Sequence, residues 1–262
     1  MKYSLHIGLN RVDPFVYGGW NGQLNACEAD ARDMAAIAEE KGFQTAIMLS
    51  EEATLRKVLD QLRYYANLAN AGDTIWITYS GHGGQLRDTS GDESDGLDET
   101  WVLFDGMVID DLMHQAYAAF RKGVRIIVFS DSCHSGTMLK AQIRENMDKI
   151  GAIGAMRAAP VAVCREYSAS FTAPKNIMRP RVKATVVLLS GCQDNQFSYD
   201  GEDNGLFTGT FLKVFDKGKF QGTYKELRRA IVKMMPPEQT PQYMTMGAKD
   251  KLFESSKIFS GR

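Results

Sequence analysis

Short runs of apolar residues alternate along this chain with longer stretches in which apolar residues recur every three or four positions. The short runs have the length and β-branched content of buried strands. They cover residues 3–9, 44–49, 74–79, 124–129 and 185–189. The longer stretches have helical spacing. They cover residues 24–41, 54–69, 110–121, 206–215 and 224–235. This alternation predicts a parallel sheet with helices on both faces.

Two further segments complete the predicted elements. Residues 101–104 and 107–109 flank Asp105-Gly106, which is a strong signal for a β-hairpin. Residues 242–246 predict a last strand. A chain of 262 residues suits one α/β domain at the large end of the usual range, so we expect a single domain over 1–262.

Residues 140–183 interrupt the alternation and show no strong periodicity. The stretch is rich in basic residues and poor in acidic ones. Its basic residues are Lys140, Arg144, Lys149, Arg157, Arg165, Lys175, Arg179, Arg181 and Lys183. We interpret it as a basic, partly mobile insertion between a first part of the domain, 1–139, and a last part, 184–262. The alternative is a solvated excursion without a function of its own.

Composition and charge argue against several classes of protein. Hydrophobic residues make up 44% and charged residues 24% of the chain, as in ordinary soluble domains. The net charge of −1 gives no overall basic field, so we expect neither nucleic acid nor a membrane as a partner. No segment approaches the ~20 apolar residues of a membrane span, and the start of the chain is too short and polar for a signal peptide. The four cysteines lack the spacing of a disulfide framework or a zinc site, which predicts reduced thiols and a cytoplasmic protein.

Residues that could carry out catalysis cluster where two predicted strands end. One strand runs into Ser80-Gly81-His82-Gly83-Gly84, and another runs into Ser130-Asp131-Ser132-Cys133. The carboxyl ends of parallel strands share one edge of a sheet, so His82 and Cys133 should lie near each other. An imidazole close to a thiol promotes the reactive thiolate. Backbone amides near Gly83 and at Cys133 are natural donors to an oxyanion.

These residue types also have a structural interpretation. A lone cysteine at a strand end is usually a small buried hydrophobe, and a lone histidine is usually structural. The joint placement in two glycine-rich strand ends favours catalysis. Cys164 and Cys192 lack such a setting, and we assign them no nucleophilic role. His6 and His114 fall within a predicted strand and a predicted helix, and we interpret both as structural.

The segments around His82 and Cys133 belong to a longer series of motifs. Tyr-Ser-Gly-His-Gly at 79–83 is followed by Asp-Ser-Cys-His-Ser-Gly at 131–136, with 51 residues from histidine to cysteine. Further motifs follow in order over most of the chain. They lie at 24–30, 91–100, 190–196 and 240–242. Together these segments resemble the metacaspases and their bacterial relatives, the orthocaspases, within the caspase-like cysteine peptidases.

The resemblance implies the caspase–hemoglobinase fold, with a mostly parallel six-stranded sheet and helices on both faces. It also implies a monomeric cysteine endopeptidase with a Cys-His dyad, in which Cys133 attacks the substrate and His82 transfers the proton. No third triad residue can be named. One alternative is a catalytically silent caspase-like scaffold that binds partners. Another is a different cysteine hydrolase or transferase on a similar sheet.

The resemblance further implies a pocket for the substrate side chain. The family builds it from positions that match Cys27, Asp30, Ser80 and Asp131, and Asp194 is a further candidate. Shielded carboxylates select a guanidinium or ammonium group by charge-assisted hydrogen bonds, so we predict cleavage of peptides and proteins after Arg or Lys. The alternatives are a surface helix position for Asp30 and a turn or cap for Asp131. A peptidase with this preference could also cut its own basic insertion.

Hard oxygen ligands are concentrated between residues 92 and 111. They suit Ca²⁺, which takes about 6–8 oxygen ligands, although the spacing is not that of an EF-hand. The resemblance implies calcium ligands at Asp98, Asp110 and Asp111, with a fourth seven residues after the nucleophile. Lys140 stands at that fourth position, and its ammonium could neutralise the acidic cluster instead. The sequence leaves calcium binding open, and we expect no cofactor to be required.

Overall fold

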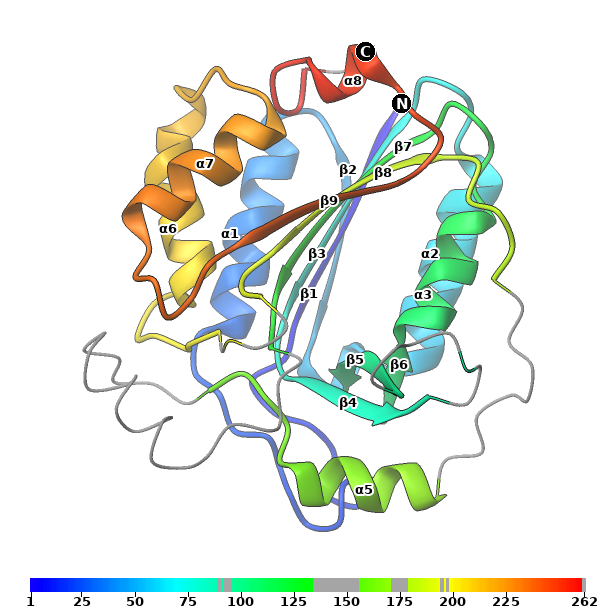
Figure 1. The fold of residues 1–262 in the computed structure, drawn as a ribbon, viewed down its shortest axis with the longest axis vertical. Coiled ribbons are helices and arrows are strands. Elements are labelled where there is room, and N and C mark those ends of the chain that lie inside the picture. Colours follow the sequence, from blue (N-terminus) through cyan, green and yellow to red (C-terminus); the bar gives the residue numbers. More distant parts are fainter. Residues whose placement is uncertain are drawn as a thin grey trace.

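The computed structural model describes residues 1–88, 91, 96–133, 156–170, 179–193, 196 and 198–260. In this part of the chain, six strands form one sheet in the order β2-β1-β3-β7-β8-β9 (Figure 1). The strands are β1 (Lys2–Gly8), β2 (Gln44–Leu49), β3 (Thr74–Ser80), β7 (Arg125–Asp131), β8 (Thr185–Ser190) and β9 (Gln242–Gly247). The first five run parallel, and β9 is antiparallel to β8. The predicted α/β fold with a mostly parallel six-stranded sheet is therefore confirmed.

Helices cover both faces of this sheet (Figure 1). One face carries α1 (Cys27–Glu40), α6 (Leu206–Phe215) and α7 (Tyr224–Met234), and the other carries α2 (Leu55–Leu68) and α3 (Asp110–Ala118). The two faces have separate cores, and neighbouring residues of β3 alternate between them. Trp76 belongs to the same core as Phe211 on one side, and Ile77 belongs to the same core as Val58 on the other. Because β3 and β7 are buried on both faces, their sequences read as continuous apolar runs.

Local sequence signals set several helix ends. At the start of α2, the Thr54 side chain accepts a hydrogen bond from the Lys57 amide. At the start of α7, Thr223 and Glu226 form a reciprocal capping box. After α1, Gly42 takes a positive φ of 76°, which lets the chain turn toward β2. These signals explain why the predicted and observed limits of these helices agree closely.

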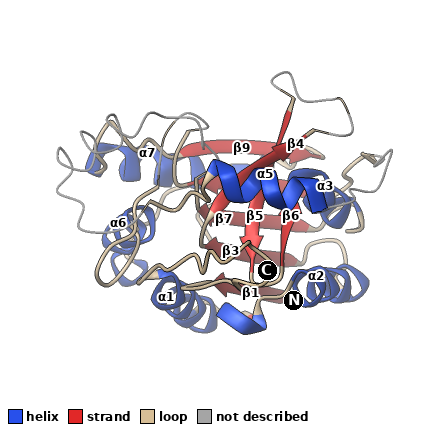
Figure 2. Cartoon of the chain, turned by 90° about the horizontal axis from the view of Figure 1, so that it is seen from below, coloured by secondary structure: helices blue, strands red, loops and turns tan. Residues whose placement is uncertain are grey.

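A smaller antiparallel sheet lies beyond the carboxyl ends of the central strands (Figures 1 and 2). It contains β4 (Gly83–Arg87), β5 (Leu97–Leu103) and β6 (Gly106–Ile109), and α5 (Val161–Ser170) packs beside β4. The hairpin predicted at Asp105-Gly106 joins β5 to β6 and is confirmed. The sequence did not predict β4 or the short α8 (Lys251–Glu254).

The basic stretch at 140–183 is more regular than we expected. Its residues 161–170 form α5, which begins directly after Pro160. The prediction of a stretch without regular structure is therefore wrong for residues 161–170. Lys140 and the rest of residues 134–155 and 171–178 lie outside the described part of the chain.

Two expectations, one about membrane-spanning segments and one about thiols, can be compared with the fold. Across the residues that the structure describes, no helix combines the length and apolar character required to cross a membrane. All four cysteines are free and buried, in agreement with the expected reduced thiols.

His6 makes stability depend on pH. It is buried in β1, where Nδ1 lies 2.9 Å from the Thr78 hydroxyl and the ring packs edge-on against Trp76. Burial lowers the pKa of His6 to about 3, so the folded protein holds the ring neutral while the unfolded chain takes up a proton below about pH 6.5. The stability that neutral His6 contributes is present above pH 6.5 and is lost as the pH falls toward 3.

We therefore predict that His6→Gln flattens the acid side of the stability profile. The free energy of unfolding of the wild type should fall between about pH 7 and about pH 5. The variant should lose clearly less over the same range, as measured by urea titration. An equal loss in both proteins would show that His6 is not responsible.

Candidate active site

The two strand ends identified in the sequence converge in the fold. β3 and β7 are neighbours, with Ser80 paired to Asp131. His82 and Cys133 each follow two residues later, and both are buried. The amides of Gly83 and Cys133 donate to one and the same acceptor, the carbonyl oxygen of Arg157, at 2.9 and 3.2 Å. Two converging amides of this kind form a site for a carbonyl oxygen that carries or develops negative charge.

His82 is held as a neutral base. Its Nε2 lies 3.1 Å from the carbonyl oxygen of Gly22, which can only accept, so Nε2 carries the proton. The Trp20 ring lies 4.7 Å away, centroid to centroid. Burial lowers the pKa of His82 to about 4, and the Gly22 carbonyl opposes this shift. Nδ1 is therefore the unprotonated nitrogen that can accept a proton.

Cys133 is fully buried in this state. Its Sγ accepts from the Ser198 amide and donates to the Ser198 carbonyl oxygen at 3.2 Å. Met156 and Ala158 pack against the small cluster that contains Cys133. The thiol is thus covered by the same short segment that carries Arg157.

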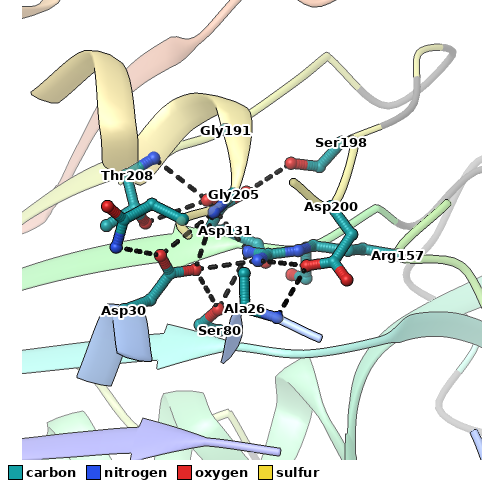
Figure 3. A network of polar contacts seen from close by, with 12 residues as sticks. Ala26, Asp30, Ser80, Asp131, Arg157, Gly191, Ser198, Asp200, Gly205 and Thr208 are labelled. Atoms are coloured by element: carbon teal, nitrogen blue, oxygen red, sulfur yellow. Dashed lines mark hydrogen bonds and ion pairs between the residues drawn. The ribbon is translucent and has the colours of Figure 1, made fainter. Parts of the chain in front are cut away.

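Three buried carboxylates surround the guanidinium of Arg157, which is itself fully buried (Figure 3). Its Nη2 lies 2.8 Å from Asp30 and 2.9 Å from Asp200, and its Nη1 lies 3.0 Å from Asp131. Nη1 also donates to the Ser80 hydroxyl at 2.8 Å. The surrounding groups thus match the planar guanidinium of Arg157, which donates in several directions.

Hydrogen bonds from the backbone and from side chains hold each carboxylate in place. Asp30 accepts from the amide of Gly205 and from the side chain of Asn204, and Asp131 accepts from the amide and hydroxyl of Thr208. Asp200 accepts from the amides of Asn25 and Ala26. Burial raises the pKa of Asp30 to about 6, and the charge of Arg157 opposes that shift. A cation in the pocket therefore favours the ionised carboxylate.

The backbone of Arg157 is bound as tightly as its side chain. Its amide donates to the Ser198 carbonyl oxygen at 3.0 Å, and its carbonyl oxygen accepts from Gly83 and Cys133. The pairing continues at the next residues, because the Ala159 amide donates to the Gly83 carbonyl oxygen at 2.7 Å. β-bridges join Met156 to Tyr199 and Ala158 to Gly83. The segment around Arg157 thus lies extended alongside the backbone of Gly83 and Tyr199.

The structure brings most of the predicted pocket residues together. Asp30, Ser80 and Asp131 contact Arg157 directly. Cys27 is buried at the start of α1, and burial raises the pKa of its thiol while the nearby charge of Arg157 opposes this. Asp194 lies outside the described residues.

Sequence reasoning missed Asp200 and did not single out Arg157. Asp200 belongs to the loop between β8 and α6, at the same sheet edge as the two catalytic candidates. Its position on that edge was the available signal, because loops after parallel strands supply binding residues. Arg157 carried no such signal, since it is one of many basic residues in a stretch without periodicity.

The proposed calcium ligands have a different partner. Asp110 and Asp111, in the first turn of α3, form ion pairs with Arg179, the first at 2.6 Å. Asp98 is buried in β5. Among the described residues, no three His, Cys, Asp or Glu side chains are arranged to hold a metal ion. Asp110 and Asp111 thus have a cationic side chain as their partner in this structure, and we derive no catalytic step through calcium.

The chain is similar in sequence and structure to several known proteins. A family model described as a caspase domain matches residues 5–253. Metacaspase-1 proteins of Mycosarcoma maydis, Kluyveromyces lactis and Schizosaccharomyces pombe are 29%, 32% and 30% identical, over 88%, 82% and 92% of this chain. The chain spans only 66%, 59% and 66% of their lengths. The crystal structure of protein GSU0716 from Geobacter sulfurreducens is 45% identical and superimposes with a TM-score of 0.88, covering 98% of both chains.

The pairing of Arg179 predicts how the acidic cluster responds to a mutation and to calcium. Arg179→Gln removes the cation from the buried Asp111, and we expect a loss of about 1–2 kcal/mol in unfolding free energy. The melting temperature of the wild type should be the same with calcium and with a chelator. Arg181→Gln, at an exposed neighbour, is the matched control and should have little effect. Marked stabilisation of the wild type by calcium would contradict this assignment.

Proposed function

The chain belongs to the caspase-domain family, and from this premise we propose that it is a cysteine endopeptidase that cuts after Arg or Lys. The resemblance to metacaspases is confirmed by the matching relatives. One observation carries the specificity: a guanidinium lies among three buried carboxylates while the carbonyl of the same residue meets the Gly83 and Cys133 amides. Such an arrangement aligns a basic side chain and a reactive carbonyl in one residue.

The proposed mechanism uses His82 and Cys133. Sγ of Cys133 attacks the carbonyl carbon after the basic residue, and Nδ1 of His82 takes the thiol proton. The amides of Gly83 and Cys133 stabilise the oxyanion, and His82 then protonates the leaving amine. Water hydrolyses the resulting thioester with His82 as the base. The neutral state of His82, which its lowered pKa favours, is the state that this first step requires.

The proposed preference follows from the charge of the pocket. Asp30, Asp131 and Asp200 can bring three negative charges to one buried site, so a guanidinium or ammonium group gains charge-assisted hydrogen bonds there. A substrate aspartate would meet like charges in a shielded environment, and a neutral side chain would leave the carboxylates without a cation.

A set of peptides that differ only in the residue before the cleaved bond tests the function. We predict a kcat/KM for Arg at least about a hundredfold above that for Asp or Asn, with Lys closer to Arg. The protein should first be incubated until its activity is constant. Cys133→Ala should show no hydrolysis above background. Preferential cleavage after Asp would refute the assignment of the pocket.

Gly205→Ala tests the pocket without changing a charge. Gly205 precedes α6 with an ordinary φ of −60°, so alanine suits the backbone, but its Cβ would overlap the guanidinium carbon of a bound arginine. We predict a loss of at least about a hundredfold in kcat/KM on Arg peptides. Gly209→Ala in the same helix is the matched control, because its Cβ would make only an ordinary 3.5 Å contact with Asn204. Equal activity of both variants would place the substrate side chain elsewhere.

A further inference from the structure

A cavity of about 540 Å³ lies between α5 and the strands β4 and β5, where α5 packs beside β4 (Figure 1). Small-molecule sites usually have volumes of roughly 300–1,000 Å³, so this cavity has room for a ligand. It shares no lining residue with the carboxylate cluster around Arg157. We propose that the cavity binds a small molecule with an apolar body and one carboxylate group, and that this ligand holds α5 against β4.

Apolar side chains form most of the cavity wall. They include Leu86 and Leu97 from the small sheet, Ala159 from the segment before α5, and Val161 and Cys164 from α5. Leu86, Ala159 and Cys164 are buried, so they belong to the floor of the cavity and not to its rim. A ligand with an apolar body would cover this wall and remove its hydrophobic surface from water.

Two arginines give the cavity its charge. Arg87 at the end of β4 and Arg165 on α5 both line the cavity, and both are exposed. Within the described part of the chain, no acidic residue lines the cavity and neither arginine forms an ion pair. Their guanidinium groups are therefore available to a carboxylate, to which arginine can donate two parallel hydrogen bonds. The same two charges would repel a cationic ligand.

A buried hydroxyl near the cavity floor has no hydrogen-bond partner. It belongs to Thr100 of β5, and a Cβ built on Gly84 would lie 3.1 Å from its Oγ1 and 3.0 Å from Sγ of Cys164. The hydroxyl is thus close to a residue that lines the cavity. A buried polar group without a partner is rare in folded proteins, and a polar atom of a bound ligand would supply the missing partner.

A ligand in this cavity would contact both sides of a joint that leads to the active site. β4 begins at Gly83, whose amide is one of the two proposed oxyanion donors, and the Ala159 amide donates to the Gly83 carbonyl oxygen at 2.7 Å. Ala159 itself lines the cavity. The ligand therefore favours the state in which Ala159 is paired with Gly83 and Arg157 is held among the carboxylates. This consequence rests on the proposed peptidase function, because an Arg substrate can enter that pocket only after Arg157 has left it.

Three probes of equal chain length test the ligand chemistry. Calorimetric titration with octanoate, below its micelle-forming concentration, should show saturable binding of one molecule per chain. Octanol should bind at least about fivefold more weakly, because it lacks the charge that the two arginines pair with, and octylamine more weakly still. Equal affinities for the three probes, or no saturable binding of octanoate, would overturn the proposal.

Charge variants test the role of the two arginines. The double variant Arg87→Gln and Arg165→Gln should bind octanoate at least about fivefold more weakly and should bind octanol as the wild type does. Arg229→Gln is the control, because Arg229 is exposed on α7 and does not line the cavity. An unchanged affinity of the double variant for octanoate would refute the role of the arginines.

A matched pair of variants on α5 tests the location of the site. Ala162 and Ala169 are both exposed on this helix, but only Ala169 lines the cavity. Ala169→Trp should fill the mouth of the cavity and weaken octanoate at least about tenfold. Ala162→Trp should bind octanoate as the wild type does. Equal binding by the two variants would place octanoate elsewhere on the molecule.

An arginyl electrophile that labels Cys133 separates this proposal from the proposed function. Its side chain displaces Arg157, so octanoate should bind at least about fivefold more weakly to the labelled protein than to the unlabelled one. Equal affinities would overturn the link between the cavity and the active site. If the electrophile does not label Cys133, the proposed function fails, whereas saturable and variant-sensitive binding of octanoate to the unlabelled protein still supports the site.

Discussion

The buried guanidinium of Arg157 determines how the whole active-site edge is assembled. It joins Asp30 from α1, Asp131 from β7 and Asp200 from the loop before α6. Charges so deeply buried persist only when they are paired, and removing one partner of such a group costs roughly 3–5 kcal/mol. Three carboxylates with one cation leave an excess of negative charge, which hydrogen bonds from the surrounding amides and hydroxyls partly offset. In this fold the three carboxylates therefore depend on the cation of Arg157.

Some parts of this arrangement could be predicted from the sequence because they follow from topology alone. Consecutive apolar runs predicted parallel strands, and parallel strands bring His82 and Cys133 to one edge. Asp131 precedes Cys133 by two positions on the same strand end, so its location followed with it. Asp30 needed the family resemblance, because a carboxylate in the first turn of a helix is usually solvated. For Asp200 the topology indicates only that its loop follows a parallel strand at the same edge, because the path of a loop is set by tertiary contacts rather than by its own sequence.

The sequence did not predict β4, α5 or the pairing of Arg157, and tertiary contacts explain each of these omissions. β4 begins with Gly83-Gly84 and lacks the β-branched residues that favour strands, so only its pairing with β5 makes it a strand. α5 contains Val161, Val163 and two serines, which are weak helix formers, and it gains its stability by packing beside β4. Arg157 contacts Asp30 across 127 positions, and no local pattern encodes a pair so distant.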